Sequence, residues 1–134
     1  MSDNGLITVQ SRYPVSQTVT RLVTGVTSKG MTIFAVVDHG DGAHIAGLSL
    51  RPTQLVLFGN AKGGTPLMQE NQTAGIDLPL KALVWEDADG KVWLTYNDPA
   101  WIAQRHALGG KSAQAVEAMT KGLDAIVKET VEGQ

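Results

Sequence analysis

Two apolar segments joined by Asp89-Gly90 constrain the fold of this chain more than any other feature. They occur in LPLKALVWEDADGKVWLTYN, residues 78–97, where apolar and aromatic residues recur on both sides of the turn. An Asp-Gly pair between two such runs is a strong signal for a β-hairpin. The chain is therefore expected to contain antiparallel strands at this position.

The length of the hairpin loop decides which side chains share a face. With a loop of two or four residues, the first face carries Leu83, Trp85, Val92, Leu94 and Tyr96, and the second carries Leu80, Ala82, Val84, Trp93 and Thr95. A three-residue loop would break this assignment.

One of these two faces is expected to form an interface. If the long helices pack on the face with Trp85, then Val84 and Trp93 lie on an exposed apolar surface, and such surfaces mark interaction sites. We therefore expect a homodimer with Val84 and Trp93 in its interface. In the alternative arrangement, the N-terminal segment or the 61–76 loop covers this face.

Hydrophobic periodicity predicts the remaining elements. Strands are indicated at residues 6–9, 31–38 and 54–59, and the last two are apolar on both faces. One helix is expected from Ser16 to Gly30, a short one from Pro99 to Gly109, and a last one that Ser112 caps. A short helical segment is expected near 41–47, and a glycine-bearing loop with one helical turn after residue 60.

This order of elements indicates an α+β fold. It reads β-α-β(4)-α, with small helical insertions and no internal repeat. Runs of strands with helices at fixed places favour a two-layer sandwich, with the helices on one face of a mainly antiparallel sheet.

Length, charge and cysteine content narrow the classes of function. A chain of 134 residues matches one domain of about 100–150 residues, so residues 1–134 are expected to form a single domain. A formal net charge of -2 provides no basic field for a polyanion, so nucleic acid is not an expected partner. The absence of cysteine removes disulfides and thiolate chemistry.

The distribution of apolar residues indicates where in the cell the protein is expected. The N-terminal sequence MSDNGLITVQSRY lacks the basic and apolar regions of a secretory signal. No apolar run approaches the ~20 residues that a membrane-spanning helix needs. We therefore expect a cytoplasmic protein with no membrane partner.

The stretch VVDHGDGAHIAG, residues 36–47, is the most suggestive candidate for chemistry. On a helix His39 and His44 would lie ~140° apart, so they do not chelate one metal as an i, i+4 pair would. Asp41 and His44 supply at most two ligands, whereas a catalytic zinc takes three from the protein. The favoured interpretation is a strand end, a turn and a helix that Asp41 caps, with no metal.

The segment FGNAKGGTPL, residues 58–67, resembles a phosphate-binding loop only in part. Lys62 precedes the two glycines, so the spacing of a nucleotide triphosphate site is missing. A weaker anion site at the backbone amides of Gly63 and Gly64 stays open.

Catalytic groups are harder to find. The chain has no G-x-S-x-G motif, and His106, beside Arg105, is interpreted as a solvated or interface histidine. Asp77 and Glu86 are an acid–base pair only if the fold brings them together. No catalytic residue and no cofactor is therefore assigned.

Several motifs together resemble those of the domain of unknown function 302 family. They are Asp38-His39 at a strand end, the small-residue segment 43–47, Phe58-Gly59-Asn60, Thr65-Pro66-Leu67-Met68, Asp77-Leu78-Pro79-Leu80, and the Asp89-Gly90 hairpin leading to Tyr96. The resemblance implies a two-layer β-α-β4-α fold and supplies no mechanism. Where the family commonly has a proline after Phe-Gly-Asn, this chain has Ala61, which predicts a less rigid loop.

The first hypothesis is a homodimeric small-ligand-binding or interaction module without catalysis. The expected ligand is a small molecule or an anion. Its binding candidates are polar residues that follow strands, namely His39, His44, Asn60, Lys62 and Asp77. The alternative is a metal-dependent or acid–base enzyme that uses His39 and His44 with a carboxylate. A third hypothesis is a regulatory subunit whose Trp93 face binds another protein.

Overall fold

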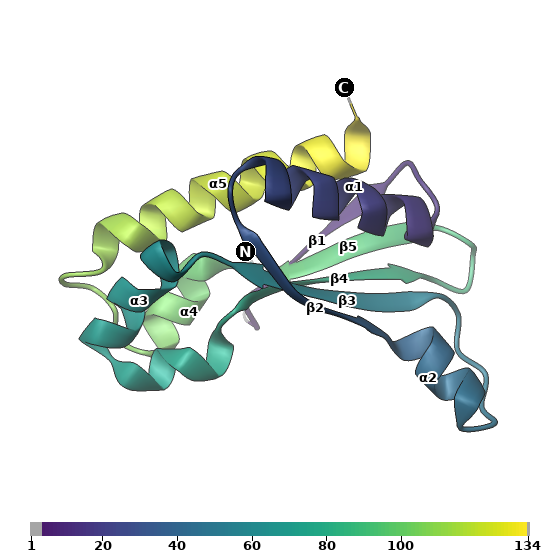
Figure 1. Cartoon of the computed structure of the whole chain (residues 1–134), viewed down its shortest axis with the longest axis horizontal. Helices are drawn as coiled ribbons and strands as arrows, with labels where there is room; N and C mark the ends of the chain where they lie inside the picture. The colour runs from purple at the N-terminus through teal and green to yellow at the C-terminus, as the bar shows by residue number, and fades with distance from the viewer. Residues whose placement is uncertain (1–3, 134) are drawn as a thin grey trace.

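A five-stranded sheet forms one layer of the molecule and two long helices form the other (Figure 1). The computed structural model describes residues 4–133. Its strands are β1 (Leu6–Ser11), β2 (Thr32–Asp38), β3 (Thr53–Gly59), β4 (Leu80–Glu86) and β5 (Val92–Asn97). Their spatial order is β1-β5-β4-β3-β2, and every neighbouring pair in this described sheet is antiparallel. The predicted α+β two-layer fold is confirmed.

The helices occupy three places around the sheet. The long ones are α1 (Val15–Ser28) and α5 (Ala113–Glu132), and the shorter ones are α2 (His39–Ile45), α3 (Ala61–Glu70), the 3-10 helix η1 (Gln72–Asp77) and α4 (Pro99–Arg105). Figure 1 shows α1 and α5 over one face, α3 and α4 at one end, and α2 at the other. Within residues 4–133, no helix is both long and apolar enough to cross a membrane.

The core lies between the two layers. Leu22 and Val26 of α1 are fully buried, and Ile126 of α5 is nearly so. They pack in one cluster with Val84 and Leu94 from the middle of the sheet. Because burying one such side chain contributes about 1.5–3 kcal/mol, this cluster fixes the helices on that face.

The predicted division of the hairpin faces is wrong, because its loop has three residues. Glu86 pairs with Val92, and the amide of Asp87 donates to the carbonyl of Lys91 at 2.8 Å, which leaves residues 88–90 as the loop. Gly90 has a φ of 81°, as the third position of such a loop requires. Val84 therefore lies in the core under the helices, whereas Trp93 lies on the open face.

The two long helices begin differently from the prediction. Ser16 lies inside α1, which starts after Pro14, and the hydroxyl of Thr18 donates to the carbonyl of Pro14 at 2.9 Å. Ser112 does precede α5, but its hydroxyl bonds to Glu70 at 2.6 Å instead of capping the helix.

The segment after β3 is more regular than predicted. Residues 61–70 form a helix of 10 residues, and the Asn60 side chain caps it by accepting from the amide of Lys62 at 2.9 Å. Glycine and proline are unfavourable in helix interiors, so the sequence Gly63-Gly64-Thr65-Pro66 did not predict a helix here. Ala61 is accordingly the first residue of a helix and not part of a loose loop.

Residues 39–52, which we call the arm, extend from the sheet between β2 and β3 (Figure 1). The arm contains α2, and all of its residues are exposed or partly exposed. It is anchored at its base, where the carbonyl of Pro52 accepts from the amide of Glu86 at 3.1 Å. The arm therefore contributes little to the core described above.

Candidate functional site

A cavity of about 590 Å³ lies at the end of the sheet where β2 and β4 begin and β3 ends. Pockets of about 300–1,000 Å³ hold small organic ligands. The walls come from these strand ends, from α3 and from α5, and their largest side chains include Met31, Phe34, Met68 and Met119. Methionine is flexible and polarisable, so these walls suit an apolar ligand of variable shape.

Two predicted binding residues, Asn60 and Lys62, line this cavity. Asn60 follows β3 directly, and Lys62 lies in the first turn of α3. Among the described residues that line the cavity, Lys62 is the one with a charged side chain, and its charge is positive. The cavity thus combines apolar walls with one cation.

The anion site that the sequence left open at the amides of Gly63 and Gly64 gains no support from the structure. Both amides donate to the carbonyl oxygen of Asn60 at 2.9 Å, because the chain has already turned into α3. These two amides are therefore not free to bind an anion.

Asp77 lies elsewhere, in a bonded cluster with α4 and the residue after it. Its carboxylate contacts Nε2 of His106 at 2.7 Å and the guanidinium of Arg105 at 3.1 Å. The Nδ1 atom of His106 contacts the hydroxyl of Thr73 at 3.2 Å. Of the two interpretations of His106, the solvated one is wrong, since this side chain is 7% exposed and both its ring nitrogens are bonded. The interface interpretation stays a prediction. The cluster holds η1 against α4.

A second bonded group ties two walls of the cavity together. The carboxylate of Glu70, the last residue of α3, accepts from the hydroxyl and amide of Ser112 at 2.6 and 2.9 Å and from the amide of Gly110 at 3.0 Å. The hydroxyl bond is the largest cause that lowers the pKa of Glu70. Sequence reasoning missed this group because its members are far apart in the chain and no motif links them.

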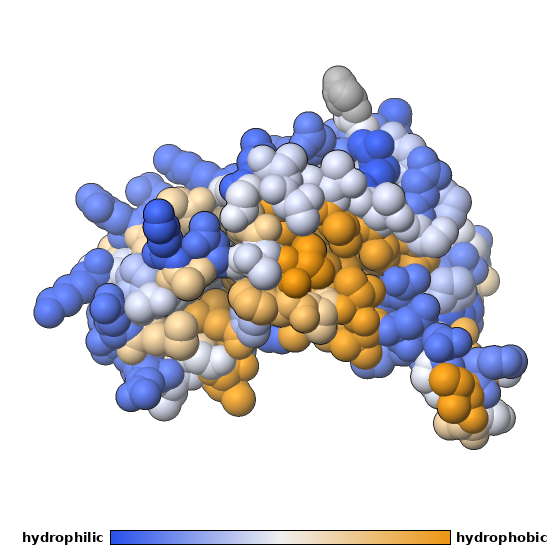
Figure 2. Space-filling model, in the orientation of Figure 1, coloured by the Kyte–Doolittle hydropathy of each residue, from blue (hydrophilic) through white to orange (hydrophobic). Residues whose placement is uncertain are grey.

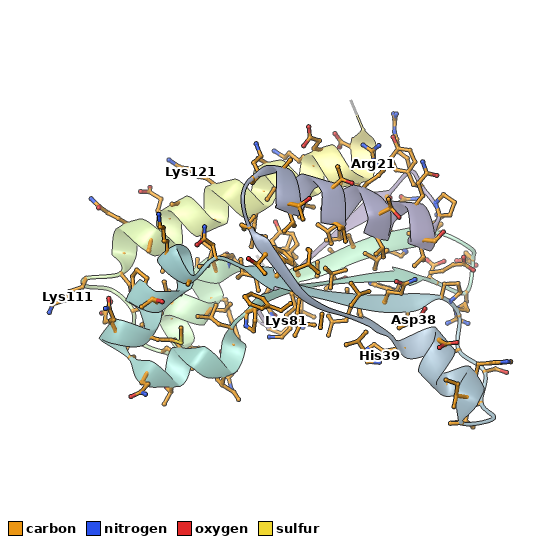
Figure 3. All side chains as sticks on the ribbon, viewed as in Figure 1. Arg21, Asp38, His39, Lys81, Lys111 and Lys121 are labelled. Atoms are coloured by element: carbon orange, nitrogen blue, oxygen red, sulfur yellow. The ribbon has the colours of Figure 1, made fainter. Side chains whose placement is uncertain are left out.

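His39 and His44 lie on the arm, away from the cavity. Asp38 pairs with Gln54, whereas Thr32, at the other end of β2, pairs with Gly59 near the cavity. In Figure 3, Asp38 and His39 lie at the base of α2, and Lys111 lies at the opposite end of the molecule. The structure therefore does not bring His39 together with Asn60.

The metal and acid–base alternatives gain no support from this geometry. In the described part of the chain, no three His, Asp or Glu side chains are placed to hold a metal ion. The α2 helix is capped by Asp38, which accepts from the amide of Asp41 at 2.8 Å, and not by Asp41 as predicted. Glu86 ends β4 while Asp77 precedes it, so a strand of about 20 Å keeps these carboxylates apart.

The open face of the sheet carries a pair of stacked tryptophans. The ring centroids of Trp85 and Trp93 are 6.4 Å apart. The indole of Trp93 donates to the carboxylate of Asp87 at 2.8 Å, and this bond is the largest cause that lowers the pKa of Asp87. Trp93 is partly exposed, so its interface role stays a prediction.

Curated relatives of this chain come from Brucella. Two proteins, from Brucella suis biovar 1 (strain 1330) and Brucella abortus biovar 1 (strain 9-941), are named "Fluoride-specific ion channel FluC 1". Each is 54% identical over 126 residues, or 94% of this chain, and the match covers 50% of the first relative and 47% of the second. The chain thus spans about half the length of the curated relatives it matches.

A solved structure shares the fold. The crystal structure of an uncharacterized conserved protein DUF302 from Bacillus stearothermophilus has a TM-score of 0.83 at 17% identity, over 96% of this chain and 98% of that one. The family profile described as "Domain of unknown function DUF302" matches residues 7–126. Because this match covers most of the sequence, the chain belongs to the domain of unknown function 302 family.

Proposed function

We propose that this chain is a homodimeric module that binds an apolar small molecule with an anionic end and performs no catalysis on it. The observation that carries this proposal is the cavity of about 590 Å³ between α3, α5 and the ends of the strands. Its walls supply burial for a hydrocarbon or aromatic body, which is the dominant favourable contribution to binding. The expected cytoplasmic location stays a prediction, which fractionation of cells would check.

The charge of the ligand follows from Lys62. A lysine among the residues that line an apolar cavity favours a carboxylate, sulfonate or phosphate and disfavours a cation. The polar side chains among the described lining residues are those of Asn60, Lys62 and Thr65. This set can orient a ligand but pairs no nucleophile with a general base, which supports binding without turnover.

Binding is tested with the fluorescent anion 1-anilinonaphthalene-8-sulfonate. Its fluorescence should rise on binding, and decanoate should displace it more effectively than decylamine. Ala118→Phe, on the α5 wall, should weaken binding about tenfold or more by filling the cavity. Ala125→Phe is the matched control, because Ala125 is exposed on the same helix. Equal probe binding by both variants would refute the assignment of the cavity.

The role of the charge is tested separately. Lys62→Met should retain the apolar walls to which the probe binds, and it should reduce the preference for decanoate over decylamine. Lys121→Met, which changes an exposed lysine of α5, should leave that preference unchanged. A preference that persists in Lys62→Met would show that the anion is recognised elsewhere.

We infer a second candidate role, in which the chain acts together with a fluoride channel. The support is its 54% identity to about half of each relative that bears the fluoride channel name. The measurement is the fluoride concentration that halves the growth of cells with the gene, without it, or with the Ala118→Phe variant. Loss of the gene should lower this concentration. An unchanged value would exclude the role.

A further inference from the structure

The strand β2 forms an edge of the sheet that is open to another strand. In the described sheet, β2 has β3 on one side and no strand on the other. Its segment Thr32–Val37 contains no charged residue and no proline. Natural edge strands are usually protected by charges, proline, β-bulges or a covering segment, because an open edge can pair with another chain. The pairing of β2 with β3 has one irregularity, between Ile33 and Ala35, and is regular from Ala35 to Asp38.

The exposed apolar side chains gather on this strand and on the arm. Of the eight large apolar side chains exposed in residues 4–133, six lie between residues 34 and 50. Figure 2 shows the apolar surface over β2 and a second apolar area on the arm. On the arm, Ile45 is 79% exposed, Leu48 67% and Leu50 51%. A helix as short as α2 is marginal in water without tertiary packing.

We propose that two copies of the chain pair through β2 and that the arm of each copy closes the cavity of the other. The closure of a ligand site rests on the proposed function, whereas the pairing through β2 does not. The occupant of the open edge is therefore a second copy of this chain.

The geometry of the strand supports this arrangement. Antiparallel pairing of β2 with itself, centred on Ala35, sets the end of β2 at Thr32 in one copy beside the end at Asp38 in the other. The arm of the second copy begins one residue later and continues past Met31, which lines the cavity together with Phe34. Its exposed Ile45 and Leu48 then lie near the mouth of that cavity.

Charge complementarity supports the same antiparallel orientation. Lys29 precedes β2 by a few residues, and Asp41 follows it by a similar number. Antiparallel pairing brings the end of β2 that Lys29 precedes in one copy beside the end that Asp41 follows in the other, and the two-fold axis repeats this proximity. A parallel pairing would instead bring like charges together, which disfavours it.

The size of the surface also suits a stable dimer. A standard interface uses about 20–30 residues from each partner. Residues 29–52 provide a contiguous and mostly exposed surface of that length. Because each copy supplies both an edge and an arm, the interface is self-complementary, as a two-fold dimer requires.

The pairing is tested by single cysteines, since the natural chain has none. In the proposed register, the two Ala35 residues face each other at about 4.5–5.5 Å between Cα atoms, which lies within the range of a disulfide. Ala35→Cys should therefore form a disulfide-linked dimer under mild oxidation. Thr8→Cys, on the opposite edge strand β1, should not. If Ala35→Cys forms no such link, the pairing in this register is refuted; a link in Val36→Cys but not in Ala35→Cys would likewise overturn this register.

The closure by the arm is tested with Ile45→Ser combined with Leu48→Ser, which leaves the cavity lining intact. This variant should bind 1-anilinonaphthalene-8-sulfonate about tenfold more weakly than the unmodified chain. Ile76→Ser is the control, because Ile76 is also exposed (72%) but lies outside the arm. Unchanged probe affinity in the arm variant would refute the closure.

Light scattering distinguishes the remaining outcomes. The unmodified chain should have twice the chain mass of 14.2 kDa, and Val37→Asp should have the mass of one chain. If Trp93→Glu dissociates the dimer while Val37→Asp does not, the interface is the open sheet face and the proposal is wrong. If the cysteine link forms but no probe binds, the proposed function fails while the pairing stands.

Discussion

The arm (residues 39–52) and the segment 61–79 both connect neighbouring antiparallel strands, yet they are held in opposite ways. The segment 61–79 buries Leu67 and Ala74, and its carboxylates bond to His106 after α4 and to Ser112 before α5. All residues of the arm remain exposed or partly exposed.

The difference shows how each segment serves the cavity. Glu70 and Asp77 in the segment 61–79 each accept more than one hydrogen bond from distant residues, so this segment forms a fixed wall. The arm presents Ile45 and Leu48 to its surroundings, so it is suited to contact another molecule. Four measurements probe this contrast.

The largest effect is expected from Leu67→Ala. Leu67 is 0% exposed, and such truncations cost about 2–5 kcal/mol because they leave a cavity. Ile45→Ala should change the free energy of unfolding by less than about 0.5 kcal/mol. Both are compared by urea denaturation in the Val37→Asp background, which removes dimer formation from the measurement. Equal losses would break the contrast between the two segments.

A smaller effect is expected from His106→Ala. The change leaves the carboxylate of Asp77 and the hydroxyl of Thr73 without their histidine partner, at a cost of about 1–3 kcal/mol. His44→Ala, on the exposed arm, should leave the free energy of unfolding unchanged in the same background. If His106→Ala is equally neutral, the bonded cluster does not stabilise the segment 61–79.

Acidification should loosen the segment 61–79 through Glu70. Its pKa is lowered below the ordinary value of 4.5, chiefly by the Ser112 hydroxyl. The stabilisation is therefore complete above about pH 4.5 and is lost as the pH falls through the lower pKa of the folded protein. The effect is modest because solvent screens the group. The urea midpoint should fall less on acidification in Glu70→Gln than in Glu117→Gln, and identical profiles would contradict this role.

The smallest effect is expected from Arg51→Ala at the base of the arm. The guanidinium of exposed Arg51 donates to the carbonyl of Glu86 at 3.2 Å. Its loss should change the free energy of unfolding by no more than about 0.5 kcal/mol. A larger decrease in the urea midpoint would mean that contacts within one chain hold the arm in place, as they hold the segment 61–79.

Much of the fold could be predicted because apolar periodicity is a local property. The hairpin at Asp89-Gly90, the strands and the packing stripe of α5 all follow from it. The faces of the hairpin could not be predicted in this way, since Asp-Gly fits loops of different length. One added loop residue changes which residues of β4 share a face with those of β5, so Val84 lies with Leu94 on the buried face.

The candidate site was predictable only in part. Asn60 and Lys62 were selected because they follow a strand, and both line the cavity. His39 was selected by the same rule, but antiparallel strands end alternately at opposite ends of a sheet. The methionines of the cavity walls cannot be distinguished by sequence from core residues, because both are apolar and follow the same periodicity.

The cavity and the open edge both involve β2, and this has a thermodynamic consequence in the proposed dimer. A ligand that binds beneath the arm of a second copy binds the dimer more tightly than the single chain, so ligand and self-association are linked. Dilution would weaken ligand affinity, and ligand would strengthen association by the same factor. The abundance of the protein in the cell would then set the ligand concentration to which it responds.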